Sequence, residues 1–149
     1  MKKDSALDGK ICFSIYTANK KFNNFYKQVL KQYGLTYQQY MVMFVLWQHE
    51  PLSVKQLGKY IDLDSGTLSP LLKRLQKSGW ITKSRSLEDE RLISIAITEK
   101  ARKAKNEIIN RVNESTEEIG LSRDEIYHAF EIIDNINTHL IRANSQNKN

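Results

Sequence analysis

Residues 64–80, with the sequence DSGTLSPLLKRLQKSGW, combine an apolar helical repeat with a polar and cationic opposite side. Four leucines recur at intervals of three and four residues, which predicts a helix with one buried stripe. They are Leu68, Leu71, Leu72 and Leu75. Gly66 and Pro70 lie near the front of this helix, where a purely structural helix favours alanine. This weak front turn raises the question of what the exposed side of the helix contacts.

Two start points are compatible with this helix. In the first, Asp64 or Ser65 is the N-cap residue, and the early glycine lets backbone or a phosphate approach closely. Pro70 is then costly, because it removes one hydrogen bond beyond the first turn. In the second, the helix begins at Pro70 with Ser69 as its cap, which follows the preference for proline at the first helical position. We favour the earlier start because Leu68 belongs to the leucine stripe.

The outward side of this helix has chemistry that suits a DNA groove. Small hydroxyl groups at its front, on Thr67 and Ser69, can enter a major groove and reach base edges. The cations further along, Lys73, Arg74 and Lys77, would meet phosphates, which position a helix without reading sequence. An ordinary solvated helix face explains the same pattern equally well when the helix is considered alone.

The segment after this helix changes from helical periodicity to a period of two. Residues 80–86 and 91–97 form two short β runs joined by residues 87–90, which predicts a β-hairpin. An arginine at position 91, held by Asp89, could be directed into a narrow minor groove, where the negative potential is strongest. The alternative for Arg91 is a surface ion pair, which contributes about 0–1 kcal/mol.

The remaining segments are predicted to be helices. Apolar residues spaced by three or four run from Leu7 to Tyr33, and Gly34 follows as a stop. Capping boxes place a hydroxyl residue at the cap and Glu or Gln three residues later, and they mark three further helix starts. These boxes begin at Thr36, Ser53 and Ser122. Thr98 is expected to cap the helix that follows the hairpin.

This order of elements predicts a single domain over residues 1–149 that is mainly α with a small β-hairpin wing. Residues 36–98 have the organisation of a winged helix-turn-helix DNA-binding region. Residues 1–34 and 99–143 form long amphipathic helices with more apolar stripe than one small core can cover. Such stripes usually pack on another chain, most commonly in a two-fold dimer. We therefore expect N- and C-terminal dimerisation helices.

Composition limits the functional classes. The chain of 149 residues has a net charge of +6, and a basic excess is compatible with solubility or with polyanion binding. The single cysteine, Cys12, and three histidines exclude a disulfide framework and a structural zinc site within one chain, and no cofactor is expected. No apolar run reaches the ~20 residues of a membrane span, and the N-terminus lacks a cleavage pattern. We therefore expect a cytoplasmic protein that is not bound to a membrane.

Cys12 is the one side chain with thiol chemistry. A single cysteine on an amphipathic helix is, on general grounds, more often a small core residue than a sensor. Tyr16 lies one turn away, however, and a phenolic hydroxyl can donate to a thiolate, which lowers the pKa of the thiol and raises its reactive fraction. Oxidation would add an oxygen and later a bulky adduct inside a tight helical interface. The helices would then shift and move the DNA-binding regions of the two subunits apart.

Two motifs in this order, LDSGTLSPLLKRLQKSGWI at 63–81 and RSLEDERLISIAIT at 85–98, resemble the MarR family of bacterial winged-helix regulators. The similarity covers nearly the whole chain. ICFSIY at 11–16, Tyr26 and LTYQQY at 35–40 are similar to the organic-hydroperoxide-sensing OhrR group, which includes MgrA and SarZ. The resemblance implies a homodimeric DNA-binding transcriptional regulator, most often a repressor, that binds a pseudo-palindromic operator in double-stranded DNA and responds to oxidative stress.

The resemblance also implies how DNA is contacted. The helix at 64–78 would enter the major groove, and the wing would reach the minor groove through Arg91 supported by Asp89. Ser69 stands where a threonine is common in the family, so the hydroxyl is kept. The residues expected to lie at the DNA are Asp64, Ser65, Gly66, Thr67, Ser69, Pro70, Lys73, Arg74, Lys77, Arg85, Asp89 and Arg91.

For the thiol, the resemblance implies redox sensing by Cys12. The tyrosines that match Tyr26 and Tyr37 hydrogen-bond this cysteine in the group, and Tyr16 lies nearby. Some relatives carry a second cysteine that resolves the oxidised thiol, and this sequence has none. The implied route is therefore oxidation of the thiol to a sulfenic acid by an organic hydroperoxide, followed by a mixed disulfide with a small cellular thiol. Engineered removal of a second cysteine is an open alternative.

Three other functions are compatible with parts of the sequence. A regulator of the same fold could respond to a small aromatic ligand between its helical and winged parts. A thiol peroxidase would need a base or cation organised at the cysteine, and the nearby sequence supplies Lys10 but no histidine. We therefore do not expect an enzyme. A protein-interaction module could use the basic face without sequence preference.

Overall fold

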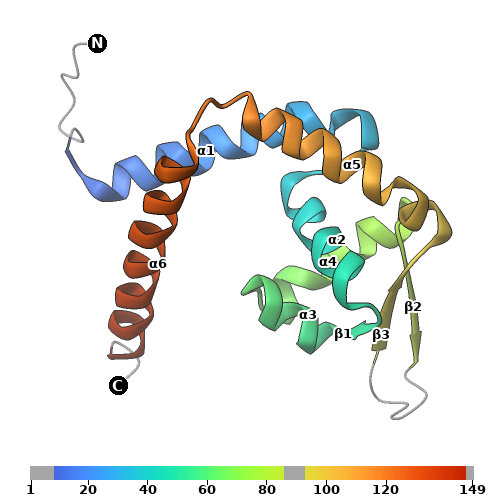
Figure 1. Cartoon of the computed structure of the whole chain (residues 1–149). Helices are drawn as coiled ribbons and strands as arrows, with labels where there is room; N and C mark the ends of the chain where they lie inside the picture. The colour runs from blue at the N-terminus through green and yellow to red at the C-terminus, as the bar shows by residue number, and fades with distance from the viewer. Residues whose placement is uncertain (1–8, 86–92, 147–149) are drawn as a thin grey trace. The chain divides into compact units, whose positions relative to one another are not determined.

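A computed structural model describes residues 9–85 and 93–146, and it confirms a mainly helical fold with a small antiparallel sheet (Figure 1). The loop predicted at 87–90 lies outside the described residues. The elements, in chain order, are α1 (Ile11–Leu30), the 3₁₀ helix η1 (Lys31–Tyr33), α2 (Tyr37–His49), β1 (Leu52–Ser53), α3 (Val54–Ile61), α4 (Ser65–Lys77), β2 (Ile81–Arg85), β3 (Ile93–Ile97), α5 (Glu99–Glu117) and α6 (Arg123–Gln146).

Helices begin where the capping boxes of the sequence predict them. The Thr36 hydroxyl accepts the backbone N–H of Gln39 at 3.2 Å, and the Gln39 side chain accepts the backbone N–H of Thr36 at 2.8 Å. Equivalent reciprocal pairs join Ser53 to Gln56 and Ser122 to Glu125. Because these caps use only local residues, the starts of α2, α3 and α6 are encoded by the sequence itself.

The first helix is shorter than its apolar repeat suggests. Gly9 adopts a left-handed φ of +74° in a turn, Lys10 is an extended N-cap, and α1 begins at Ile11. Leu7, which starts the repeat, lies outside the described residues. At the other end the last turn tightens into η1, and Gly34 stops it in the left-handed conformation, as its position predicts.

A tight turn joins α3 to α4. Asp62 ends α3 in a left-handed conformation with φ of 51°, and the backbone N–H of Leu63 donates to the Gly58 carbonyl at 3.0 Å. The turn therefore folds back directly over Gly58. A Cβ atom at Gly58 would lie 2.6 Å from the Leu63 carbonyl oxygen and 3.3 Å from a methyl group of Leu68. Only glycine fits this position without a shift of the backbone.

A Gly58→Ala variant is accordingly expected to unfold at lower urea concentration, with a loss of about 1–2 kcal/mol in the free energy of unfolding. The alanine adds intrinsic helix propensity, but the clash with backbone outweighs that gain. Gly66→Ala is the matched control, because its Cβ would meet only the flexible side chain of Asp64, at 3.1 Å. Equal urea midpoints for Gly58→Ala and the wild type, at one protein concentration, would contradict the close approach.

The sheet has a strand that the sequence did not predict. Strand β1 pairs antiparallel with β3 through Leu52↔Ile95 and Ser53↔Ser94, which gives the strand order β1-β3-β2. The predicted hairpin is present as β2 and β3, paired from Ile81↔Ile97 to Arg85↔Ile93. A two-residue strand carries no periodic pattern, so only the fold can place it beside β3.

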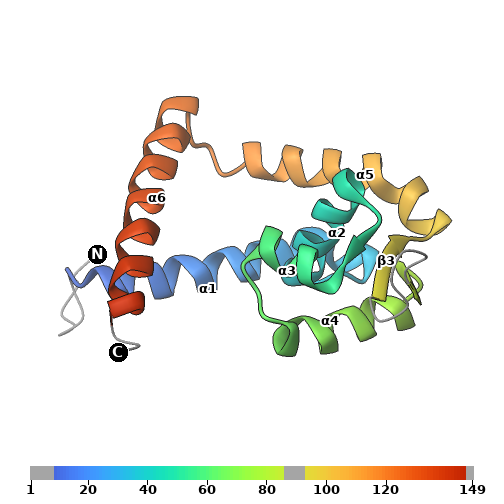
Figure 2. The ribbon, with the colours of Figure 1, turned by 90° about the horizontal axis from the view of Figure 1, so that it is seen from below.

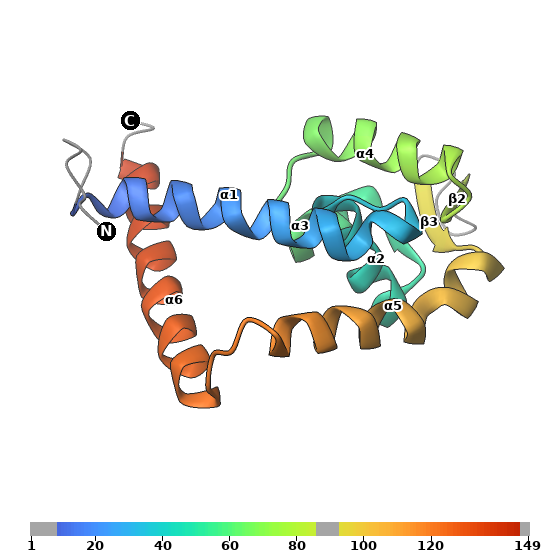
Figure 3. The same ribbon diagram turned by 90° about the horizontal axis from the view of Figure 1, so that it is seen from above.

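The main core lies in the first of two compact units, which covers residues 1–112. Figures 2 and 3 show α4 at one edge of this unit and the first part of α5 at the opposite edge, with α2 between them. Apolar side chains from the end of α1, from α2, α3 and α4, from the sheet and from α5 meet there. The most deeply buried include Leu30, Val42, Met43, Leu46, Leu57, Leu68, Leu75, Ile95 and Ile108.

The second unit covers residues 113–149 and contains α6. Helix α5 begins in the first unit and ends in the second. Large apolar side chains of α6 are exposed in the single chain, including Phe130 at 69% and Ile133 at 55%. That residues 1–149 form one domain stays a prediction.

Candidate functional site

Helix α4 begins at the earlier of the two predicted start points. The Asp64 carboxylate accepts the backbone N–H of Thr67 at 2.7 Å and the Thr67 hydroxyl at 3.3 Å. These hydrogen bonds lower the pKa of Asp64 below its ordinary value, the bond from the Thr67 backbone contributing most. The cap is therefore a carboxylate at neutral pH, and the alternative start at Pro70 does not occur.

Proline inside α4 makes the front of the helix less regular. Pro70 has no N–H to donate to the carbonyl of Gly66, four residues earlier. The hydroxyl of the preceding Ser69 donates to the Ser65 carbonyl at 2.7 Å. The buried leucine stripe holds the helix in place, since Leu68, Leu71, Leu72 and Leu75 are each at most 2% exposed.

The opposite side of α4 is exposed along its whole length. Its front presents small groups and its later turns present cations, as the sequence predicts. The exposed residues include Ser65, Gly66, Thr67, Ser69, Pro70, Lys73, Arg74 and Lys77. These side chains share one accessible surface that starts at the Asp64 cap, and we call it the α4 face.

The wing is described only in part. Arg85 is exposed at the end of β2, where it pairs with Ile93. Asp89 and Arg91 lie outside the described residues. Their roles at a minor groove stay predictions.

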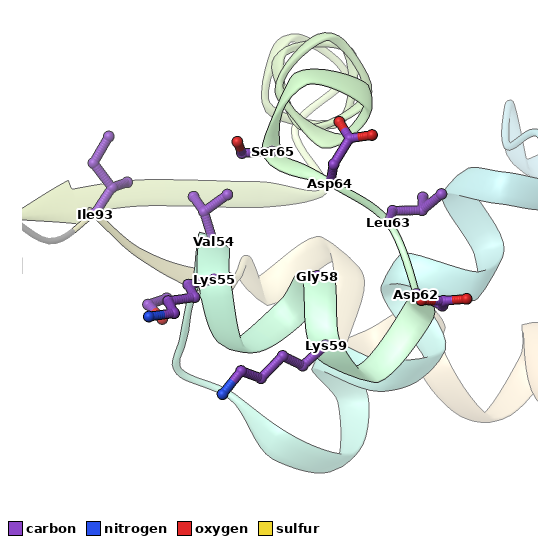
Figure 4. A pocket seen from close by; sticks show the side chains of 10 residues that line it. Val54, Lys55, Gly58, Lys59, Asp62, Leu63, Asp64, Ser65 and Ile93 are labelled. Atoms are coloured by element: carbon purple, nitrogen blue, oxygen red, sulfur yellow. The ribbon is translucent and has the colours of Figure 1, made fainter. Parts of the chain in front are cut away.

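An open hollow of about 920 Å³ adjoins the start of α4, between α3 and β3 (Figure 4). Lys55 and Lys59 of α3 line it together with Asp64, Ser65 and the exposed Ile93 of the wing. The two lysines are four residues apart, so they lie on one side of α3. Sequence reasoning did not assign them to the DNA site, although this spacing in front of the predicted turn was the available indication. Both lysines thus line the hollow that adjoins the first residues of α4.

The predicted redox residues form two separate groups within one chain. Cys12 is exposed on α1. Tyr16 is also exposed, at 61%, and its ring stacks against Phe13 with the centroids 6.4 Å apart. Tyr26 follows Cys12 by 14 residues in the same helix, a separation of about 21 Å along the axis.

Tyr26 belongs to an aromatic cluster between α1 and α2. Its ring stacks on Tyr37 with the centroids 4.3 Å apart and contacts Tyr40 at 5.9 Å. Burial is the larger cause that raises the pKa of Tyr37, and the neighbouring Tyr26 adds to it. Burial, with smaller effects of Tyr26 and Tyr37, raises the pKa of Tyr40 to about 12. These two phenols therefore remain protonated at neutral pH, and each can donate a hydrogen bond.

Residues 24–108, which include the whole helix-turn-helix and the wing, match the family described as Transcriptional regulator SarA/Rot. The chain belongs to the SarA/Rot family of transcriptional regulators. Its winged-helix organisation and its relatives also confirm the predicted resemblance to MarR-type regulators.

The relatives of this SarA/Rot-family chain are regulators. The HTH-type transcriptional regulator SarZ of Staphylococcus saprophyticus is 37% identical over 93% of this chain and 95% of SarZ. The Organic hydroperoxide resistance transcriptional regulator of Bacillus subtilis is 44% identical over 62% of this chain and 63% of that protein. TtmR of Methylorubrum extorquens is 47% identical over 69% of this chain, which spans about half, 53%, of the length of TtmR.

Solved structures carry the same fold. Reduced AbfR bound to DNA has a TM-score of 0.77 and 35% identity, with 91% of this chain and 94% of that chain covered. AbfR is from Staphylococcus epidermidis, and it has also been solved overoxidised on DNA and in a disulfide form. The SarA/Rot-family chain is therefore a DNA-binding transcriptional regulator.

Two further findings concern the described residues 9–85 and 93–146. They include no helix long and apolar enough to cross a membrane. Across the same residues, no group of three or more His, Cys, Asp or Glu side chains could hold a metal ion.

Proposed function

We propose that this chain is a homodimeric repressor that holds operator DNA through the α4 face and the wing, and releases it when organic hydroperoxide oxidises Cys12. The observation that carries the DNA-binding part is the α4 face itself. A carboxylate cap and a fully buried leucine stripe fix the helix, so that its hydroxyls and cations all face outward. Helix-turn-helix proteins place such a helix in the major groove.

Exposed apolar helices support the dimer. The stripe of α6 is accessible in the single chain, and α1 presents Ile11 at 63% and Ile15 at 47% exposure. Soluble monomers rarely expose apolar stripes of this extent. A second copy of the chain covers both helices in one symmetric step, and the two α4 faces then meet two half-sites of a palindromic operator.

The spacing along α1 supports a thiol site shared between subunits. Tyr26 lies about 21 Å from Cys12 along the helix, so the Tyr26–Tyr37 pair of the same chain cannot reach the sulfur. In the dimer, a Tyr26–Tyr37 pair of the other copy would donate its phenol hydrogens to the thiolate, with Tyr16 alongside. The protonated state of Tyr37 fits this role as a donor.

The proposed oxidation has two steps. The Cys12 thiolate attacks the terminal oxygen of the hydroperoxide, an S–O bond forms, the O–O bond breaks, and an alcohol leaves after protonation. A small thiol then attacks the sulfenic acid, an S–S bond forms and water leaves. The adduct is too bulky for a packed helical interface, so the subunits rearrange and the two α4 faces no longer match the operator. The hydroperoxide regulator of Bacillus subtilis and the disulfide form of AbfR support this proposal.

The structure of overoxidised AbfR bound to DNA bears on which product releases DNA. In that relative, an oxidised state is compatible with DNA binding. We therefore assign release in this chain to the bulky mixed disulfide rather than to added oxygen alone. A hydroperoxide treatment without a small thiol should release less operator than the treatment with both.

The experiment that tests the function is a mobility-shift titration on the DNA upstream of the chain's own gene. Binding with a preference over unrelated DNA, and loss of binding after hydroperoxide and small thiol, is the expected result. Equal affinity of the wild type for every DNA would instead favour a non-specific interaction module.

Lys73→Ala should weaken binding similarly on all sequences and reduce the slope of log affinity against log salt concentration by about one unit.

A further inference from the structure

One carboxylate connects three elements at the base of the wing. Glu50 follows α2 directly, and its side chain is 19% exposed. One carboxylate oxygen accepts the backbone N–H of Ile97, the last residue of β3, at 2.6 Å. The other accepts from the guanidinium of Arg102, in the first turns of α5, at 2.7 Å. Glu50 thus ties the end of β3 to both α2 and α5.

The bond to Ile97 takes the place of a missing strand pair. Strand β1 covers β3 only at Ser94 and Ile95, whereas β2 pairs with the other edge of β3 as far as Ile97. Ile97 lies two residues beyond Ile95, so its N–H points to the same side as that of Ile95. No backbone of β1 reaches this N–H. The Glu50 carboxylate accepts it and extends the ladder by one bond.

Other contacts hold α5 to α2 independently of Glu50. The indole N–H of Trp47 donates to the Ala101 carbonyl at 3.0 Å, and the Lys105 ammonium donates to the Trp47 carbonyl at 3.0 Å. Both bonds join the two helices, and neither involves the wing. Removing the charge of Glu50 should therefore leave α5 packed on α2 and loosen chiefly the hold on β3.

We propose that Glu50 is a positioning residue for the wing, which fixes the direction of the β2–β3 hairpin relative to α4. The inference rests on the proposed binding of operator DNA by α4 and the wing together. The described part of the hairpin runs from the Ile81–Ile97 pair to the Arg85–Ile93 pair, so a small rotation at the Ile97 end displaces the far end by a larger distance. With Glu50 in place, the wing and the α4 face can enter neighbouring grooves at the same time.

The test compares operator affinities of the full-length protein and its variants. Glu50→Gln replaces the two charged acceptor oxygens by one neutral acceptor and an amino group, so the bond from the Ile97 N–H loses its acceptor or its charge assistance, and the ion pair with Arg102 is lost. We expect about tenfold weaker binding, as for the loss of a hydrogen bond to a charged group, and a smaller preference for A·T-rich flanks. Lys103→Gln is the matched control, because Lys103 is exposed on α5 and pairs with Glu99 at 3.8 Å, and it makes no hydrogen bond or ion pair with the part of the wing that the structure describes. It should bind as the wild type does.

A double-variant cycle with Arg91→Ala shows whether Glu50 acts through the wing. If it does, Glu50→Gln should cost little once the wing arginine is gone, because the two effects are coupled. Additive losses, or a flank preference that Glu50→Gln leaves at its wild-type value, would overturn the inference. So would a variant that unfolds at lower temperature than Lys103→Gln by enough to explain its weaker binding. Wild-type protein that shows no preference for its own upstream DNA would instead overturn the proposed function.

Discussion

A Cys12→Ser variant is expected to bind operator DNA as tightly as the wild type, and to remain bound after treatment with an organic hydroperoxide and a small thiol. Serine keeps a small side chain with a donor group, but its hydroxyl forms neither a sulfenic acid nor a disulfide. The same treatment should weaken operator binding by the wild type between about fivefold and 150-fold, the usual size of coupling between two sites. Mobility-shift titrations of both proteins, before and after treatment, measure this difference.

A control variant that moves the thiol to another position on α1 tests whether release of DNA requires the cysteine at position 12. Ser14 is exposed on α1 two residues after Cys12, so a cysteine there faces a different side of the helix. The Cys12→Ser/Ser14→Cys protein should become oxidised and still hold DNA. Equal release of wild type and Cys12→Ser would reject the sensor role. Mass spectrometry that finds Cys12 unmodified at hydroperoxide concentrations that release DNA would favour control by a small aromatic ligand.

Phe130→Glu should convert the protein from dimer to monomer at micromolar concentration. Phe130 is 69% exposed in the single chain and belongs to the apolar stripe of α6. In a symmetric dimer the substitution places a charge in the interface twice. We expect the dissociation constant of the dimer to rise at least about thirtyfold, as for the loss of a central aromatic anchor. Sedimentation-velocity ultracentrifugation over a concentration series measures the constant.

The matched control for this variant lies on the same helix. Asn135→Glu adds the same charge at an exposed position about 140° around the helix from Phe130. It should leave the dimer intact. Wild-type protein that sediments as a monomer at every concentration would reject the dimer, and with it the thiol site shared between subunits. Operator affinity of Phe130→Glu should fall together with dimerisation, since each half-site alone binds weakly.

Features that depend on neighbouring residues were predictable from the sequence. The caps at Thr36, Ser53 and Ser122 each use a residue three positions away, and the structure forms all three. The leucine stripe of α4 and the early start at Asp64 were also predictable. The stripe follows from the spacing of the leucines, and the start follows from a carboxylate that can accept the free backbone N–H groups of the first helical turn.

Features that join distant parts of the chain were not predictable. Strand β1 exists because β3 lies beside residues 52 and 53, although about forty residues separate them in sequence. The bond from Glu50 to Ile97 spans 47 residues, and no spacing rule indicates it. The separation between Cys12 and Tyr26 could have been calculated from the sequence, because both lie in one predicted helix and the rise per residue of an α-helix is fixed. The resemblance implies that Cys12, Tyr26 and Tyr37 lie at one site, and the site shared between two copies of the chain is our proposal to account for their separation within one chain.

In the proposed complex, the hydrogen bonds at the front of α4 limit which bases its two hydroxyl groups can recognise. The hydroxyl hydrogens of Thr67 and Ser69 are already committed, to the Asp64 carboxylate and the Ser65 carbonyl. Only oxygen lone pairs remain for an approaching nucleobase. These two hydroxyl groups therefore prefer the exocyclic amino groups of cytosine and adenine in the major groove and disfavour the guanine O6 and N7 atoms. Operator half-sites should accordingly place A or C, rather than G, opposite these two side chains.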